Sequence, residues 1–139
     1  GAANWISMYA QSDHREFRTP WFGGTPWQAN APSELFWAQS PLKDAAKVKT
    51  PTLFFVGQDD PRLPLPQSVE MYRALTAAGV ETKLYVAPRE GHQGFELRHQ
   101  VMKGNLEREG VEGHVMGRRY TLEEVPGDTP ATAPLPKPR

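Results

Sequence analysis

The fold class is decided by residues 50–94, which read TPTLFFVGQDDPRLPLPQSVEMYRALTAAGVETKLYVAPREGHQG. The apolar run from Leu53 to Val56 is typical of a strand that is covered on both faces of a parallel sheet. A helical pattern follows from about Pro66 to Ala78, and the segment from Thr82 to Val86 predicts a second strand. The stretch therefore predicts one strand–helix–strand unit of an α/β fold.

Each predicted strand is followed by side chains that can carry chemistry. The acid pair Asp59-Asp60 follows the first strand, and His92 follows the second. Parallel strands joined by a right-handed crossover point the same way and lie only ~5 Å apart, so both loops leave the same edge of the sheet. An acid at this edge can reach His92, and an acid that orients a histidine forms two-thirds of a nucleophilic triad.

The first fifty residues are rich in aromatic side chains, which lie among turns that contain glycine and proline. One interpretation is an apolar wall of a substrate pocket, because such pockets are commonly lined with aromatic rings. The other interpretation, more common for any single ring, is that the rings pack loops onto the sheet. The candidates for the pocket wall are Trp5, Tyr9, Trp21, Phe22 and Trp27.

The composition limits the kinds of partner that this protein is expected to bind. Sixteen basic and sixteen acidic residues leave no net charge, so electrostatics favour neither nucleic acid nor an anionic membrane. No apolar run approaches the ~20 residues of a membrane span. The absence of cysteine excludes disulfides and thiolate metal sites, and it leaves the compartment and the oligomeric state open.

Several segments together resemble the prolyl oligopeptidase family of serine peptidases, within it the acylaminoacyl-peptidase and dipeptidyl-peptidase-like bacterial members. These segments are Asn4–Tyr9, Phe22–Trp27, Ser40–Leu42, Lys49–Leu53, Gly57–Pro64 and Glu90–His92. The resemblance implies an α/β fold, the C-terminal portion of an α/β-hydrolase domain with a parallel sheet and flanking helices. It also implies an N-terminal β-propeller in the intact protein, which limits the size of the substrate.

The resemblance assigns roles to the acid and the histidine. The family's acid lies in the pattern acid–any–Arg–aliphatic–Pro, which matches residues 60–64, so Asp60 and not Asp59 would be the triad acid. His92 would take the proton of the nucleophile and return it to the leaving amine, while Asp60 would hold the imidazole tautomer. Arg62 would be structural or would help to set the acid-bearing loop.

The expected nucleophile is not in this chain. Alpha/beta-hydrolases carry the serine in G-x-S-x-G, before the acid and the histidine, and this motif does not occur in the 139 residues. The serine, the oxyanion-hole donors and the propeller are therefore expected before Gly1 in an intact protein that hydrolyses short peptides through an acyl-enzyme. The chain alone is expected to be an inactive fragment.

Residues 1–109 are expected to form the hydrolase part, with a closing helix from Phe95 to about Arg108. Residues 110–139 are expected to be a polar, proline-rich and disordered tail.

Neither a metal site nor a cofactor is expected. His92, Glu96 and His99 lie close in sequence, but there is no H-E-x-x-H motif and no further ligand.

Two other functions fit the same acid and histidine. One is an esterase or a dienelactone-type hydrolase, and a β-propeller encoded upstream would favour the peptidase over it. The other is a catalytically dead hydrolase-like module that binds a partner, and glycine or alanine at the position of the upstream serine would favour that function.

Overall fold

The structure, a computed structural model, describes residues 1–93 and 95–120. The elements, in chain order, are α1 (Trp5–Gln11), α2 (Arg15–Phe22), α3 (Ser33–Ala38), the 3-10 helix η1 (Pro41–Lys47), β1 (Thr52–Gly57), α4 (Leu65–Ala77), β2 (Thr82–Ala87) and α5 (Leu97–His114). The tail expected at residues 110–139 lies, from residue 121 onward, outside the described residues.

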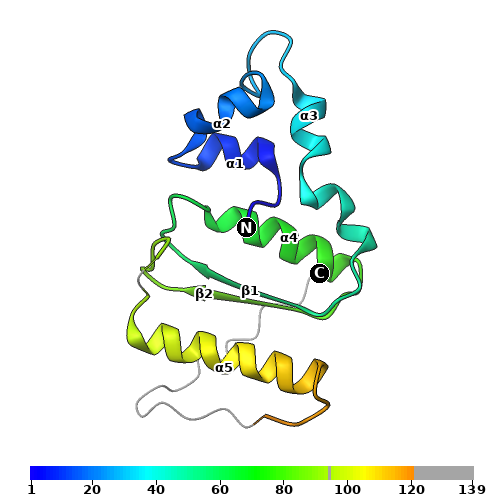
Figure 1. Cartoon of the computed structure of the whole chain (residues 1–139), viewed down its shortest axis with the longest axis vertical. Coiled ribbons are helices and arrows are strands. Elements are labelled where there is room, and N and C mark those ends of the chain that lie inside the picture. Colours follow the sequence, from blue (N-terminus) through cyan, green and yellow to red (C-terminus); the bar gives the residue numbers. More distant parts are fainter. Residues whose placement is uncertain (94, 121–139) are drawn as a thin grey trace, which may run out of the picture.

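The two strands form a parallel sheet with helices on both faces (Figure 1). Helix α4 covers one face and α5 covers the other, while α1, α2 and α3 form a cap beyond α4. Thr52 pairs with Thr82 and Gly57 with Ala87, so the two strands end at the same edge. The predicted strand–helix–strand unit is therefore confirmed, and the loops after both strands leave from the carboxyl edge.

Local sequence explains where α4 begins and ends. Pro66 lies in its first turn, where a missing N–H costs little, and the helix ends before Gly79. Gly79 has φ +77°, a left-handed conformation that side chains with a β carbon disfavour, and it turns the chain back toward the sheet. Leu75 then packs with Val80 and Ala45 in the buried cluster between α4, η1 and the strands.

The cap has a hydrophobic cluster of its own, made by Tyr9, Phe22 and Phe36 with Trp5 packed against it. The rings of Phe22 and Phe36 stack with centroids 4.0 Å apart, and Phe36 is fully buried. Aromatic rings from three short helices thus form the hydrophobic cluster of the cap.

Buried polar groups join the cap to α4. The side chain of Gln67, which is 1% exposed, accepts the N–H groups of Ala3 and Asn4 at 3.0 Å each and donates to Ser7 Oγ at 2.8 Å. On the other side, Ser40 Oγ accepts the N–H of Trp5 at 2.9 Å. These bonds give acceptors to the N–H groups of Ala3, Asn4 and Trp5, and they fix the start of α1 between α4 and Ser40.

Helix α5 is longer than its sequence indicates. The prediction that it ends at about Arg108 is wrong, because the helix continues to His114. Lys83 at the start of β2 pairs with Glu109 at 3.0 Å, and His114 lies 3.4 Å from Glu81. These contacts place the last turns of α5, which contain two glycines of low helix propensity, beside the start of β2. In the described part of the chain, no helix combines the length and the apolar character that a membrane crossing needs.

Candidate active site

The acid and the histidine that follow the two strands meet at the carboxyl edge of the sheet. His92 Nδ1 lies 2.9 Å from Asp60 Oδ2. The carboxylate of Asp60 is 8% exposed, whereas the imidazole of His92 is 35% exposed. The proximity that the strand topology predicts is confirmed, while the catalytic role of either residue stays a prediction.

Asp60 is oriented by its own loop, residues 58–64, which we call the acid loop. Its Oδ1 accepts the backbone N–H groups of Arg62 at 2.8 Å and of Leu63 at 2.9 Å. These two bonds fix the carboxylate so that Oδ2 faces His92. The neighbouring Asp59 is exposed, and its backbone N–H donates to the carbonyl oxygen of Glu90 at 2.9 Å.

The turn between α1 and α2 holds the acid loop from the side of the cap. Asp13 N–H donates to Pro61 O at 3.0 Å, and Ser12 Oγ donates to Arg62 O at 2.9 Å. The guanidinium of Arg62 returns two bonds to the Asp13 carboxylate, at 2.8 and 3.2 Å, and these bonds lower the pKa of Asp13. Arg62 therefore makes the loop-setting contacts that the family resemblance implies.

A buried arginine extends this network into the cap. Arg18, which is 9% exposed, donates from Nη1 to Ser12 Oγ at 3.0 Å and lies over the ring of Trp5, 5.5 Å from its centroid. Burial lowers the pKa of the Arg18 guanidinium, which still remains a cation at neutral pH. The acid loop is thus linked through Ser12 and Arg18 to an aromatic ring of the cap.

The candidate pocket-wall residues do not form one surface. Tyr9 and Phe22 are 2% and 5% exposed, so these two rings are interior packing of the cap. Trp5 packs against them, and Trp27 meets the ring of Tyr9 edge-on with centroids 5.1 Å apart while remaining 60% exposed.

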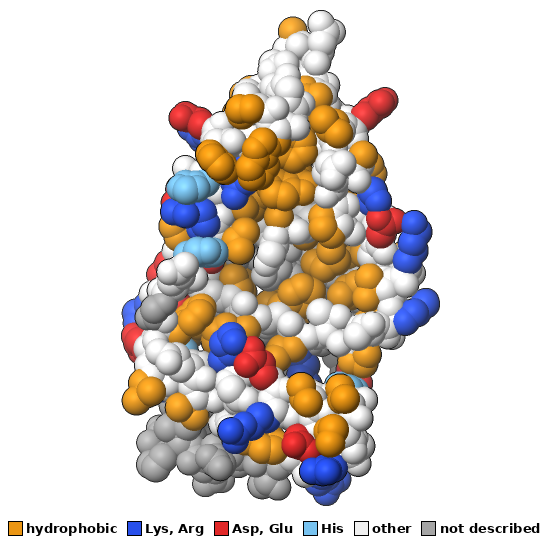
Figure 2. All heavy atoms as spheres, in the orientation of Figure 1, with side chains coloured by type: hydrophobic (Ala, Val, Ile, Leu, Met, Phe, Trp, Pro, Cys, Tyr) orange, Lys and Arg blue, Asp and Glu red, His pale blue; other side chains and the backbone are white. Residues whose placement is uncertain are grey.

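Trp21 lies outside this cluster. It is 62% exposed, and its ring meets that of Phe17, which is also exposed, at 5.1 Å. Figure 2 shows apolar side chains gathered over the cap on one face of the molecule. Trp5, Trp21 and Trp27 thus keep accessible surface, and their place in a substrate wall stays a prediction.

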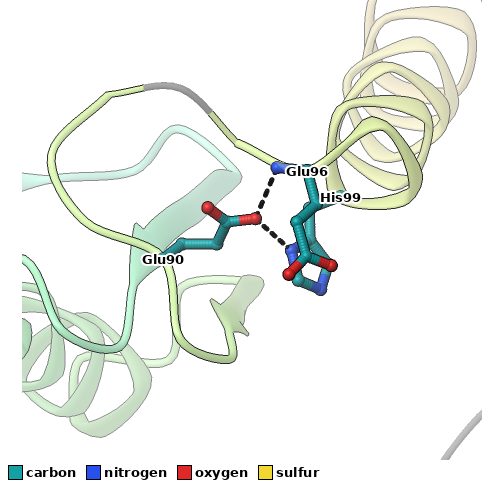
Figure 3. Close-up of side chains that lie close together, drawn as sticks. All are labelled: Glu90, Glu96 and His99. Atoms are coloured by element: carbon teal, nitrogen blue, oxygen red, sulfur yellow. Dashed lines mark hydrogen bonds and ion pairs between the residues drawn. The ribbon is translucent and has the colours of Figure 1, made fainter.

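Sequence reasoning missed a buried pair between the loop that carries His92 and the start of α5. Glu90 Oε1 lies 2.5 Å from His99 Nδ1 and accepts the backbone N–H of Glu96 at 2.6 Å (Figure 3). The only sequence signal was the position of Glu90, two residues before His92.

The set of potential metal ligands that the structure brings together differs from the set considered in the sequence. Among the described residues, the three that bring ligand atoms within 4.8 Å of one another are Glu90, Glu96 and His99, without His92. The Glu90 oxygen and the His99 nitrogen that would face a cation are hydrogen-bonded to each other instead.

A cavity of about 380 Å³ lies at the other end of the strands, between α5 and the first residues of β1 and β2. Thr52, Lys83 and Val111 are among the residues that line it. Substrates of open α/β sheets bind at the carboxyl ends of the strands, so this cavity is on the wrong edge for the Asp60–His92 pair.

Comparison with known proteins gives concordant results. The sequence profile of the prolyl oligopeptidase family matches residues 1–109. The uncharacterized peptidase YuxL of Bacillus subtilis is 39% identical over 97 residues, which is 70% of this chain and 14% of that protein. The acylamino-acid-releasing enzyme of Rattus norvegicus is 44% identical over 59 residues, which is 42% of this chain and 8% of that enzyme.

A solved structure shows the same fold. The acylaminoacyl peptidase of Pyrococcus horikoshii superposes on 90% of this chain with a TM-score of 0.72 and 28% identity. The α/β-hydrolase fold expected from the sequence is thereby confirmed. The chain spans only 20% of that protein, so it corresponds to a small part of each relative.

Proposed function

The chain belongs to the prolyl oligopeptidase family, and on that premise we propose that it supplies the acid and the base of a serine-peptidase triad. Asp60 is the acid and His92 is the base. The observation that carries the proposal is the 2.9 Å contact between Asp60 Oδ2 and His92 Nδ1 at the carboxyl edge of the parallel sheet. The intact protein would hydrolyse short peptides through an acyl-enzyme.

The geometry supports this assignment of roles. A carboxylate on Nδ1 favours the tautomer with its proton on that nitrogen, which leaves the Nε2 lone pair free to accept the proton of a nucleophile. Asp60 is buried and held by two backbone N–H groups, whereas part of the His92 ring remains exposed. The base is thus oriented on one side and accessible on the other.

Each chemical step moves one proton through His92. In acylation, His92 Nε2 takes the proton of a serine hydroxyl as its oxygen attacks the scissile carbonyl, and then gives it to the leaving amine. In deacylation, His92 takes a proton from water and returns one to the serine as the acid product leaves. Asp60 stabilises the imidazolium formed in both steps, and the reaction needs no cofactor.

We infer that the serine comes from a segment of the same protein outside these 139 residues. All five serines of the chain lack the flanking glycines of the nucleophile elbow, namely Ser7, Ser12, Ser33, Ser40 and Ser68. The small share of each relative that the chain covers supports this inference. The substrate class to test first is the acyl-aminoacyl amide, because two relatives are named for releasing acylamino acids or cleaving acylaminoacyl peptides.

The test uses the intact protein, a fluorophosphonate probe, an acyl-aminoacyl anilide and a simple ester. We expect labelling and amide hydrolysis, both lost in His92→Gln and both retained in His114→Gln, an exposed histidine at the far end of α5. Ester cleavage without amide cleavage would replace the peptidase by an esterase, and the absence of labelling and of both activities would favour a binding module. The 139-residue chain alone should remain unlabelled.

A further inference from the structure

Two neighbouring residues tie the histidine loop, residues 88–93, to its surroundings: Arg89 through an exposed pair with Glu96 at 3.2 Å, and Glu90 through both its backbone and its buried side chain. The carbonyl oxygen of Glu90 accepts the N–H of Asp59 at 2.9 Å, which ties this loop to the acid loop. The side chain points the other way and is 5% exposed (Figure 3). Glu90 thus connects the end of β1 with the start of α5.

The carboxylate of Glu90 has two partners at the start of α5. Oε1 accepts the N–H of Glu96, the N-cap residue of α5, whose own side chain makes no capping bond. The same oxygen lies 2.5 Å from Nδ1 of His99, which is 4% exposed. The carboxylate thus accepts hydrogen bonds from two donors, a backbone N–H at a helix N-terminus and a buried imidazole. Bonds to a carboxylate at such a place are charge-assisted and stronger than bonds between neutral groups.

Contacts on either side of Glu90 leave His92 dependent on this anchor. Arg89 has φ +61°, a strained value for a residue with a β carbon, and this turn directs Glu90 inward. Beyond His92, Phe95 meets the ring of Phe55 on β1 at 5.2 Å. Between these points, the hydrogen bond to Asp60 is the one that His92 makes within the described residues, and Gly91 has no side chain that could anchor the loop.

We propose that the buried Glu90–His99 pair is the positioning device that holds His92 in line with Asp60. The inference rests on the proposed function, because it concerns the same histidine. Both side chains are buried, and they act by fixing the backbone two residues before His92. A displacement of a catalytic group by ~1 Å can lower a rate by about a hundredfold, so the pair should affect turnover strongly.

The test compares disruptive and conservative variants in the intact protein. Glu90→Ala and His99→Ala remove the pair, whereas Glu90→Gln keeps an acceptor and His99→Asn keeps a donor close to the position of Nδ1. The matched controls are Glu81→Ala and His114→Ala, which break an exposed glutamate–histidine pair at the other end of α5.

For the disruptive variants we expect kcat to fall at least about tenfold with KM within about twofold, because misalignment affects the transition state more than ground-state binding. The conservative variants should stay within about threefold of the wild type, since they preserve the hydrogen bonds. The inference is overturned if both alanine variants keep their kcat, or if only KM changes.

Should the alanine variants fail to fold, Glu90→Asp gives the same comparison. Its shorter side chain keeps the charge but does not reach Glu96 N–H and His99 together, so kcat should again fall while Glu90→Gln remains active.

A second readout does not require activity. In NMR spectra of the protein with ¹³C-labelled histidine, the His92 signal is assigned as the one that is missing in His92→Gln. This signal should be single and sharp in the wild type and in Glu90→Gln, and broadened or doubled in Glu90→Asp. A single unchanged signal in Glu90→Asp would refute the positioning role even in a protein without hydrolase activity. A wild type that hydrolyses nothing but shows the expected signals would instead refute the proposed function alone.

Discussion

Gly57, the last residue of β1, lies so close to the backbone of Glu90 that a β carbon at Gly57 would stand 2.4 Å from the Glu90 carbonyl oxygen. The carbonyl oxygen of Gly91 would lie equally close. Because both contacts are to backbone, no side-chain rotation relieves them. The strand that leads to Asp60 and the loop that carries His92 therefore pack backbone to backbone, and this approach brings the two side chains together.

The first prediction concerns this packing. Gly57→Ala should push the histidine loop away from the end of β1, lowering the free energy of unfolding by about 1–3 kcal/mol and reducing kcat. Gly104→Ala is the matched control, since an added β carbon would meet no atom within 4 Å beyond its chain neighbours and the nearby backbone of its own helix, and alanine favours a helix by up to ~1 kcal/mol. Thermal unfolding and amide hydrolysis measure both effects. Full activity in Gly57→Ala would mean that the two loops tolerate separation.

The second prediction separates the two adjacent acids. Asp60→Asn should lower kcat by about 10⁴-fold, the loss seen when an asparagine replaces the acid of a serine-protease triad and selects the wrong histidine tautomer. Asp59→Asn should change kcat by less than about twofold, because the Asp59 side chain is exposed, forms no hydrogen bond or ion pair within the described residues, and leaves the tie to Glu90 to the backbone. Steady-state kinetics with an acyl-aminoacyl anilide distinguishes them. Equal losses in both variants would contradict the assignment of Asp60.

The sequence was sufficient for the strand–helix–strand unit and for the meeting of Asp60 with His92. Both depend on rules that connect local pattern to geometry: an apolar run predicts a buried strand, and a right-handed crossover places successive loops at one edge. The helix predicted from Pro66 to Ala78 is observed from Leu65 to Ala77, because its proline and glycine boundaries are also local signals.

What the sequence did not reveal depends on contacts between distant residues. Gln67 and Ser40 fix the start of α1 from positions 64 and 35 residues away, and no periodicity marks them as buried. The pairing of Glu90 with His99 depends on how α5 docks on the sheet, which its weakly amphipathic sequence does not specify. The same docking extends α5 beyond Arg108 through contacts with β2.

The third prediction concerns acid pH and the acid loop. Arg62 lowers the pKa of Asp13 below its ordinary 3.8, so the folded state binds this proton less readily than the unfolded state. The stabilisation is therefore fully present above pH 3.8 and is lost as the pH falls through the lower folded pKa. Asp13→Asn should show a smaller loss of stability in this range, measured by the thermal midpoint as a function of pH.

Asp44→Asn is the control for this experiment. Lys43 and Lys47 lower the pKa of Asp44 to about 2, so its stabilisation is lost between pH 3.8 and about 2. Asp44 lies on η1, where its carboxylate pairs with Lys43 and Lys47, so only Asp13→Asn should also reduce kcat near neutral pH. An unchanged kcat in Asp13→Asn would show that the acid loop keeps its shape without the Arg62 contact.

The fourth prediction concerns the junction between the cap and α4. Gln67→Leu has nearly the same size but leaves the buried N–H groups of Ala3 and Asn4 without their acceptor, which should cost about 1–3 kcal/mol. Amide hydrogen exchange at residues 3–5 should accelerate roughly ten- to a hundredfold, since local opening becomes easier by that amount.

Gln67→Glu keeps the acceptor and loses only the donor to Ser7, so it should give a smaller change. Gln11→Leu, at an exposed position on α1, is the control for a glutamine-to-leucine change without burial. Equal exchange rates in Gln67→Leu and Gln11→Leu would mean that the aromatic cluster of the cap, and not Gln67, fixes α1 on α4.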